Sequence, residues 1–109
     1  RVVAIFQPHR YSRTLTFLSD FAKSFSHADA VVLTDIYSAG ESNSGQIDGE
    51  RLAALVANHH PQVTYLPTLA AVEEFLGDNL RSGDTALFLG AGNLNQIIPN
   101  AIERIKAKG

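Results

Sequence analysis

The sequence predicts an α/β domain built on a mainly parallel sheet. Four short apolar runs rich in β-branched residues are spaced along the 109 residues, and a segment with helical periodicity follows each run. Continuous apolar runs are typical of strands that are buried on both faces of a parallel sheet. Strands that alternate with helices pair in parallel through right-handed crossovers. The β-α-β-α-β-α-β-α order therefore predicts a Rossmann-like three-layer α/β/α fold.

The boundaries of these elements follow from capping residues and from proline. The expected strands span residues 2–6, 30–36, 62–66 and 85–90. The expected helices span residues 12–26, 48–60, 68–80 and 93–107. Residues that cap helix N-termini stand at three of these starts: Ser12, Asp48 and Thr68. Pro99 is tolerated only near a first turn, so the last helix is expected to begin near Ile98.

Composition and charge argue against several classes of function. A net charge of -2 predicts no general attraction to nucleic acid or to an anionic membrane. The absence of cysteine excludes disulfides and thiolate metal sites. No zinc motif and no phosphate-binding G-x-x-x-x-G-K-S/T loop is present, and no apolar run approaches the roughly 20 residues that span a bilayer. The chain begins inside a strand-like run without methionine, which indicates a piece of a longer protein.

Three polar loops follow expected strands, and they are the candidate site. They are QPHRYSRT (7–14), DIYSAGESN (35–43) and GAGN (90–93). In open parallel α/β sheets, ligands bind at the carboxyl ends of the strands, so the three loops are expected to meet at one edge. Besides His9, Arg10 and Arg13, the residues expected to line the crevice are Tyr11, Tyr37, Glu41, Gly90, Gly92 and Asn93.

The first loop carries the strongest chemical signal. Arg10 and Arg13 are three residues apart at the opening of an expected helix, so their guanidinium groups would lie on one face. Together with the free N–H groups of a helix start, they would suit a carboxylate or a phosphate. His9 would add a hydrogen bond. The alternative is an exposed helix start with solvated arginines, although arginines in a first turn oppose the helix dipole, which favours a functional reason.

Other features carry weaker signals. Gly90 and Gly92 allow a tight turn or a close approach to a ligand, but the dinucleotide motif G-x-G-x-x-G is not completed, so a plain strand-to-helix turn stays open. A single loop glutamate such as Glu41 is usually a solvated charge. His59 and His60 are adjacent, point different ways on a helix, and are expected at a helix C-terminus rather than on a metal.

Three stretches together resemble the C-terminal domain of the Mur ligases: FQPHRYSRT (6–14), DIYSAGE (35–41) and LFLGAGN (87–93). They occur in the family's order, and the resemblance covers nearly the whole chain. It implies a three-domain cytoplasmic enzyme of peptidoglycan synthesis, and hence of cell shape and division. The enzyme uses ATP and Mg²⁺ to join L-alanine to UDP-N-acetylmuramate through an acyl phosphate. An N-terminal domain binds the UDP part, a central domain binds ATP, and the C-terminal domain closes over both.

Residue by residue, the resemblance implies that Arg10 and Arg13 bind the incoming amino acid and that His9 is catalytic beside the reacting groups. The family's phosphate-binding loop and its D-D-Y-G-H-H-P motif are absent; HHP at 59–61 ends a helix and is not that motif. Residues 1–109 are therefore expected to be the C-terminal domain without its first strand and helix, inactive alone. Asn93 stands where aspartate is more usual. The alternatives are the related murein tripeptide recycling ligase, a non-catalytic flavodoxin-like binding module, and a scaffold fragment without a ligand.

Overall fold

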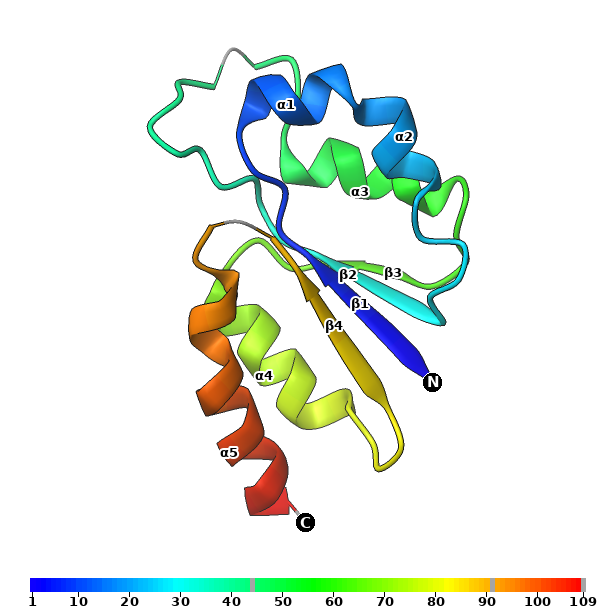
Figure 1. Cartoon of the computed structure of the whole chain (residues 1–109), viewed down its shortest axis with the longest axis vertical. Helices are drawn as coiled ribbons and strands as arrows, with labels where there is room; N and C mark the ends of the chain where they lie inside the picture. The colour runs from blue at the N-terminus through cyan, green and yellow to red at the C-terminus, as the bar shows by residue number, and fades with distance from the viewer. Residues whose placement is uncertain (44, 91, 109) are drawn as a thin grey trace.

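The computed structural model describes residues 1–43, 45–90 and 92–108. Strands and helices alternate as the sequence predicts (Figure 1). In chain order they are β1 (Val2–Phe6), α1 (Tyr11–Thr16), α2 (Leu18–Lys23), β2 (Ala30–Leu33), α3 (Gly49–Ala57), β3 (Val63–Tyr65), α4 (Leu69–Asn79), β4 (Thr85–Leu89), the 3-10 helix η1 (Leu94–Ile97) and α5 (Ile98–Lys108). Among the described residues, no helix has the length and hydrophobicity needed to cross a membrane.

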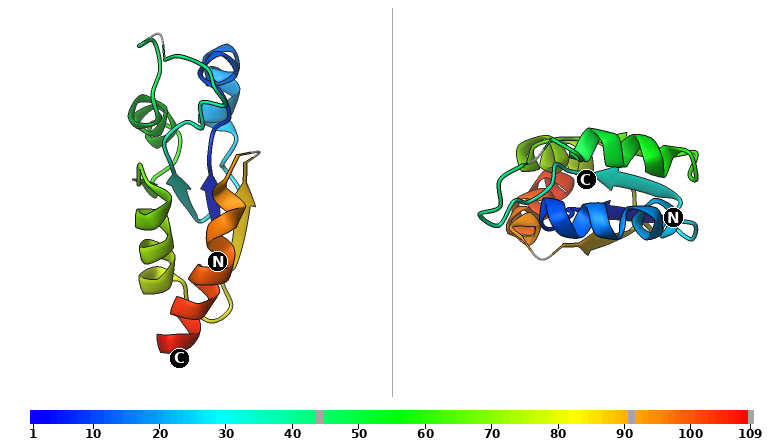
Figure 2. Two further views of the ribbon diagram at one scale, coloured as in Figure 1. Left: turned by 90° about the vertical axis from the view of Figure 1, so that its left-hand side faces the viewer. Right: turned by 90° about the horizontal axis from the view of Figure 1, so that it is seen from above.

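The four strands form one sheet in the order β3-β2-β1-β4, and every neighbouring pair is parallel. Helices α1 to α3 lie on one side of this sheet, and α4 and α5 lie on the other (Figures 1 and 2). The predicted three-layer α/β/α arrangement is therefore confirmed. Because all the strands point the same way, their carboxyl ends meet at one edge of the sheet, where the loops after β1, β2 and β4 begin.

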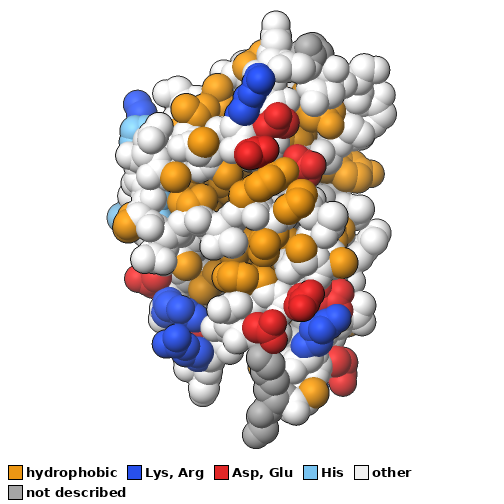
Figure 3. Space-filling model, turned by 180° about the vertical axis from the view of Figure 1, so that it is seen from behind, with side chains coloured by type: hydrophobic (Ala, Val, Ile, Leu, Met, Phe, Trp, Pro, Cys, Tyr) orange, Lys and Arg blue, Asp and Glu red, His pale blue; other side chains and the backbone are white. Residues whose placement is uncertain are grey.

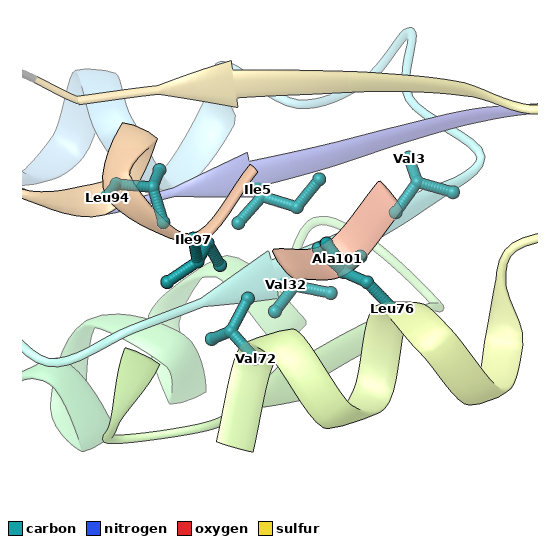
Figure 4. Packing of buried hydrophobic residues seen from close by; sticks show 8 residues of the cluster. All are labelled: Val3, Ile5, Val32, Val72, Leu76, Leu94, Ile97 and Ala101. Carbon is teal, nitrogen blue, oxygen red and sulfur yellow. The ribbon is translucent and has the colours of Figure 1, made fainter. Parts of the chain in front are cut away.

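Each face of the sheet has its own hydrophobic core. On one face, side chains of β1 and β2 pack against α4, η1 and α5 (Figure 4). The buried residues of this cluster are Val3, Ile5, Val32, Val72, Leu76, Leu94, Ile97 and Ala101. On the other face, the alternate residues of the same strands pack with the segment around α2 and with α3: Ala4, Phe25, Val31, Leu33, Leu52, Ala53 and Val56. The two cores hold the central strands β1 and β2 rigidly in place.

Local sequence signals predicted three helix starts correctly, although α3 ends at Ala57 rather than at residue 60. The side chain of Asp48 accepts a hydrogen bond from the Arg51 amide at the start of α3. Thr68 accepts one from the Ala71 amide at the start of α4. Helix α5 begins at Ile98, as the position of the proline predicts.

The expected helix over 12–26 is wrong in its start and in its continuity. Ser12 does not cap it, because the residue at the N-cap is Arg10, which has φ 68° and makes no side-chain cap bond. The helix also breaks at Phe17, which separates α1 from α2. The hydroxyls of Thr14 and Thr16 donate to carbonyls four residues earlier, a pattern that bends helices.

The expectation that all four strands are buried on both faces is wrong for β4. Its residues alternate between exposed and half-buried, and Leu87 and Leu89 are 45% and 42% exposed. The strand lies at an edge of the sheet, and no described helix covers it on the side of α1 to α3. The opposite edge strand, β3, is also only partly buried. Seen from behind (Figure 3), hydrophobic side chains gather across the middle of the molecule, with charged side chains above and below them.

Candidate functional site

The loops after β1, β2 and β4 meet at the carboxyl edge of the sheet, as the parallel arrangement predicts. The first and second loops pair through their backbones: the Tyr37 amide donates to the Pro8 carbonyl at 2.8 Å, and the Arg10 amide donates to the Tyr37 carbonyl at 2.7 Å. These two bonds form an isolated parallel bridge between His9 and Tyr37. The first loop is therefore held like a short extension of the sheet.

A buried glutamine joins the first loop to the third. The Oε1 atom of Gln7 accepts a hydrogen bond from the Leu94 amide at 3.1 Å. The Nε2 atom of the same side chain donates a hydrogen bond to Oδ1 of Asn93 at 2.8 Å. Gln7 is only 5% exposed, and these two bonds satisfy both ends of its amide. Gln7 is not among the residues predicted for the site, although a glutamine that directly follows a buried strand is a signal for a buried polar contact.

The contact from Gln7 also gives a physical account of Asn93. What the contact needs at position 93 is an acceptor oxygen, and the carboxylate of an aspartate supplies one as well as an amide does. Asn93 in place of aspartate is thus compatible with the same turn. In this structure the residue supports the turn rather than pointing to a separate ligand.

Gly92 is required where the three loops touch. A Cβ atom at this position would lie 2.6 Å from Cγ of Tyr37 and 2.8 Å from Oε1 of Gln7, both too close for non-bonded atoms. A Cβ at Gly90 would lie 3.1 Å from the Gln7 carbonyl oxygen, which is tight but less severe. The two glycines therefore serve close packing between the loops.

The ring of His9 stacks on the ring of Tyr37, with centroids 5.6 Å apart and planes inclined by 19°. His9 is half-buried, whereas Tyr37 is 37% exposed. The phenol ring of Tyr37 thus fills the space between the imidazole and Gly92. Stacking on one face and backbone pairing on both sides leave His9 little freedom to turn.

Arg10 has an unusual backbone conformation, with φ 68° and ψ 140°. This region is sparsely populated by residues with a side chain, and it costs on the order of 1–3 kcal/mol unless neighbouring contacts hold it. Three contacts do so here: the Arg10 amide donates to Tyr37, and its carbonyl accepts from the amide and the hydroxyl of Thr14. Strain of this kind clusters at functional sites, which makes the first loop a candidate for one.

Arg10 and Arg13 line an open groove of about 420 Å³. The groove is bordered by His9, Arg10, Ser12, Arg13, Thr16 and Phe17. A smaller hollow of about 170 Å³ adjoins it, and His9 and Arg13 belong to both. Both arginine side chains are exposed, and within residues 1–43, 45–90 and 92–108 neither forms a salt bridge. The groove therefore presents two guanidinium groups and an imidazole to solvent.

Glu41 contacts the start of α1 instead of being a solvated loop charge. Its Oε1 accepts from the Ser12 amide at 2.8 Å, and its Oε2 accepts from the Ser12 hydroxyl at 2.5 Å. The hydroxyl first, and then the amide, lower the pKa of Glu41, with a smaller contribution from the charge of Arg10. Of the N–H groups at this helix start, which are expected to help bind an anion, the Ser12 amide is already engaged by Glu41, and α1 has only 6 residues.

The remaining predicted residues lie away from the groove. Tyr11 is half-buried on the other side of α1, where it lines a hollow of about 230 Å³ with Leu15 and Glu41. His60 is buried: its Nδ1 accepts from the Gln62 amide, and its Nε2 donates to the Ala28 carbonyl at 2.6 Å. In the described part of the chain, no group of three or more His, Cys, Asp or Glu residues is placed to hold a metal ion.

Comparison with known proteins gives close relatives over almost the whole chain. The chain is 72% identical over 102 residues to the UDP-N-acetylmuramate–L-alanine ligase of Nostoc punctiforme. The aligned region covers 94% of this chain and 21% of the relative. The chain is 70% identical over 107 residues to the ligase of the same name from another Nostoc strain, which covers 98% of this chain and 22% of the relative. No family model matches the chain.

A solved structure has the same fold. The UDP-N-acetylmuramate–alanine ligase of Thermotoga maritima superposes with a TM-score of 0.75 at 24% identity, over 99% of this chain and 21% of that one. The chain spans about a fifth of the length of the curated relatives that it matches. The three motifs indicate a resemblance to the Mur ligases, and over that span the resemblance is confirmed.

Proposed function

We propose that this chain is the C-terminal domain of an ATP-dependent ligase that joins L-alanine to UDP-N-acetylmuramate in peptidoglycan synthesis, and that it binds the incoming amino acid. The high identity to curated ligases of that name supports the reaction and its substrates. The fold shared with the Thermotoga maritima ligase supports the assignment to a domain. The remaining four fifths of such a protein would bind the nucleotides and the sugar, and residues 1–109 alone are expected to be inactive.

The residues present do not fit ATP or Mg²⁺. The sequence has no phosphate-binding loop of the G-x-x-x-x-G-K-S/T type, and the described residues include no candidate metal cluster. We therefore assign neither group to this domain and derive no step through them. What the domain offers is a positively charged groove beside an imidazole, which suits the carboxylate and the amine of an amino acid.

The groove of Arg10 and Arg13 is the observation that carries the proposal. Guanidinium groups bind carboxylates through two parallel hydrogen bonds, and an exposed pair without a salt bridge is free to do so. With the amino-acid carboxylate held there, the adjacent imidazole of His9 would hydrogen bond the amine and fix its direction of attack. Holding the amine in one orientation is how such a domain would speed amide formation.

The test is Arg13→Ala in the full-length ligase. A hydrogen bond to a charged group contributes about 1.5–3 kcal/mol, so kcat/KM for L-alanine should fall roughly ten- to hundredfold. The KM for ATP should stay within about twofold. Arg13→Lys should restore activity only in part, because lysine lacks the planar fork. Arg81→Ala removes another exposed arginine, from the far end of the sheet, and serves as the control. Unchanged use of alanine by Arg13→Ala would contradict the proposal.

A further inference from the structure

The second loop holds the start of α1 from two sides. On one side, the backbone of Tyr37 pairs with the residues that flank His9. On the other side, the carboxylate of Glu41 accepts both hydrogen bonds that Ser12 can donate from its amide and hydroxyl. Ser12 stands between Arg10 and Arg13 in the chain. The two contacts therefore enclose the segment that carries both guanidinium groups.

This segment needs support from outside. Arg10 has a left-handed φ of 68°, which is costly for a residue with a Cβ atom, and α1 has no side-chain cap of its own. An isolated helix of 6 residues is also too short to persist by itself. In the described part of the chain, Glu41 is the side chain that satisfies the first turn of α1. Without it, the first turn loses a partner for a backbone amide.

We propose that Glu41 is a positioning residue for the amino-acid groove: by binding Ser12 it fixes the first turn of α1 and so directs Arg10 and Arg13. It acts through Ser12 and does not touch the amino acid. Both of its oxygens are already engaged, and a carboxylate in contact with the substrate carboxylate would repel it. This inference rests on the proposed function of the groove.

The chemistry of the contact predicts how variants differ. Glu41→Ala removes both acceptors. Glu41→Gln keeps the shape, because its Oε1 still accepts from the Ser12 amide and its Nε2 donates to the Ser12 hydroxyl, which accepts as well as donates. Ser12→Ala removes only the hydroxyl and keeps the amide bond. If geometry is what matters, Glu41→Ala is the severe variant and Glu41→Gln is mild.

The experiment measures steady-state kinetics of the full-length ligase and hydrogen exchange at the Ser12 amide. In Glu41→Ala we expect the KM for L-alanine to rise about three- to tenfold, with the KM for ATP and for the sugar nucleotide unchanged. Exchange at Ser12 should speed up. Glu41→Gln should stay within about twofold of the wild type. Glu74→Ala, an exposed glutamate on α4, is the matched control and should change neither readout.

A double variant tests whether Glu41 acts through the arginine. Because Glu41 is proposed to act through Arg10 and Arg13, the part of its effect that passes through Arg13 is lost once Arg13 is gone, so Glu41→Ala should raise the KM for alanine less in Arg13→Ala than in the wild type. Suppose that Glu41→Ala speeds exchange at Ser12 but leaves the KM for alanine unchanged, while Arg13→Ala raises that KM. This result would overturn the inference and leave the proposed function standing. So would unchanged exchange at Ser12, or full additivity of the two variants. An unchanged KM in Arg13→Ala itself would overturn the proposed function, and the inference with it.

Discussion

Replacing Gly92 with alanine tests how tightly the three loops are packed. Alanine adds a single methyl group at this position, and the test concerns the contacts of that methyl group. The new methyl group would lie 2.6 Å and 2.9 Å from two ring carbons of Tyr37, and 2.8 Å from Oε1 of Gln7. Optimal contacts between carbon atoms are about 3.5–4.0 Å, so these neighbours have to move by roughly 1 Å.

The two neighbours differ in how easily they move. The ring of Tyr37 is 37% exposed and can swing outward, at the cost of its stacking on His9. Gln7 is buried and held by hydrogen bonds to Asn93 and Leu94, so it cannot move without breaking one of them. Inserting a methyl group into such a site costs about 1–3 kcal/mol of unfolding free energy. For a domain of this size each kcal/mol lowers Tm by roughly 4–8 °C.

Thermal unfolding of the 109-residue chain is the assay, with Gly90→Ala as the graded control. A Cβ at Gly90 would lie 3.1 Å from its nearest neighbour, so Gly90→Ala should lose less stability than Gly92→Ala. Tyr37→Ala should reduce the cost of Gly92→Ala in a double variant, because one of the two clashes is then removed. A Gly92→Ala chain as stable as the wild type, or a cost that Tyr37→Ala leaves unchanged, would refute the interlocked arrangement of the loops.

Two further predictions concern single contacts in the same chain. Asn93→Asp preserves the acceptor for Gln7, so its Tm should stay within about 2 °C of the wild type. Asn93→Leu leaves the buried amide donor of Gln7 unpaired, so its Tm should fall by roughly 4–8 °C. Equal losses of Tm in the two variants on thermal unfolding would contradict this account. Bonds from the Arg1 side chain and then the Arg81 amide lower the pKa of Asp84 to about 2. A carboxylate with a lowered pKa stabilises the fold above the unfolded value near 3.9 and loses that effect as pH falls through about 2. The Tm difference between wild type and Asp84→Asn should therefore be constant from pH 5 to 7 and shrink toward pH 2, and a difference independent of pH would count against the ion pair.

The features that the sequence predicts well are those that depend on neighbouring residues. The N-caps at Asp48 and Thr68 and the start of α5 at Ile98 each follow from chemistry within three residues. The features that it does not predict depend on distant ones. Gln7 and Asn93 are 86 residues apart, and Glu41 reaches Ser12 across 29. No local pattern in a single sequence reports such pairs.

The start of α1 shows how a distant contact overrides a local signal. Ser12 has the residue type of an N-cap, and a helix beginning there would have left its first amides free. Instead the N-cap is Arg10, two residues earlier, which has a left-handed φ where the first loop pairs with Tyr37. Ser12 then falls inside the helix as a donor to Glu41. The N-cap rule that favoured Ser12 therefore fails in the segment that bears the arginines. Conflicts of this kind between local preference and structure are expected at functional sites.

At the carboxyl edge of the sheet, some groups hold the loops together and others remain unpaired. Backbone pairing with Tyr37, the buried amide of Gln7 and the close contact at Gly92 together fix the three loops against one another. Glu41 occupies the Ser12 amide in the first turn, so that amide is not available to an anion. What is left facing the groove is charge on long side chains: the guanidinium groups of Arg10 and Arg13. Under the proposed function, this base would stay in place while the arginine side chains adjust to the carboxylate of the amino acid.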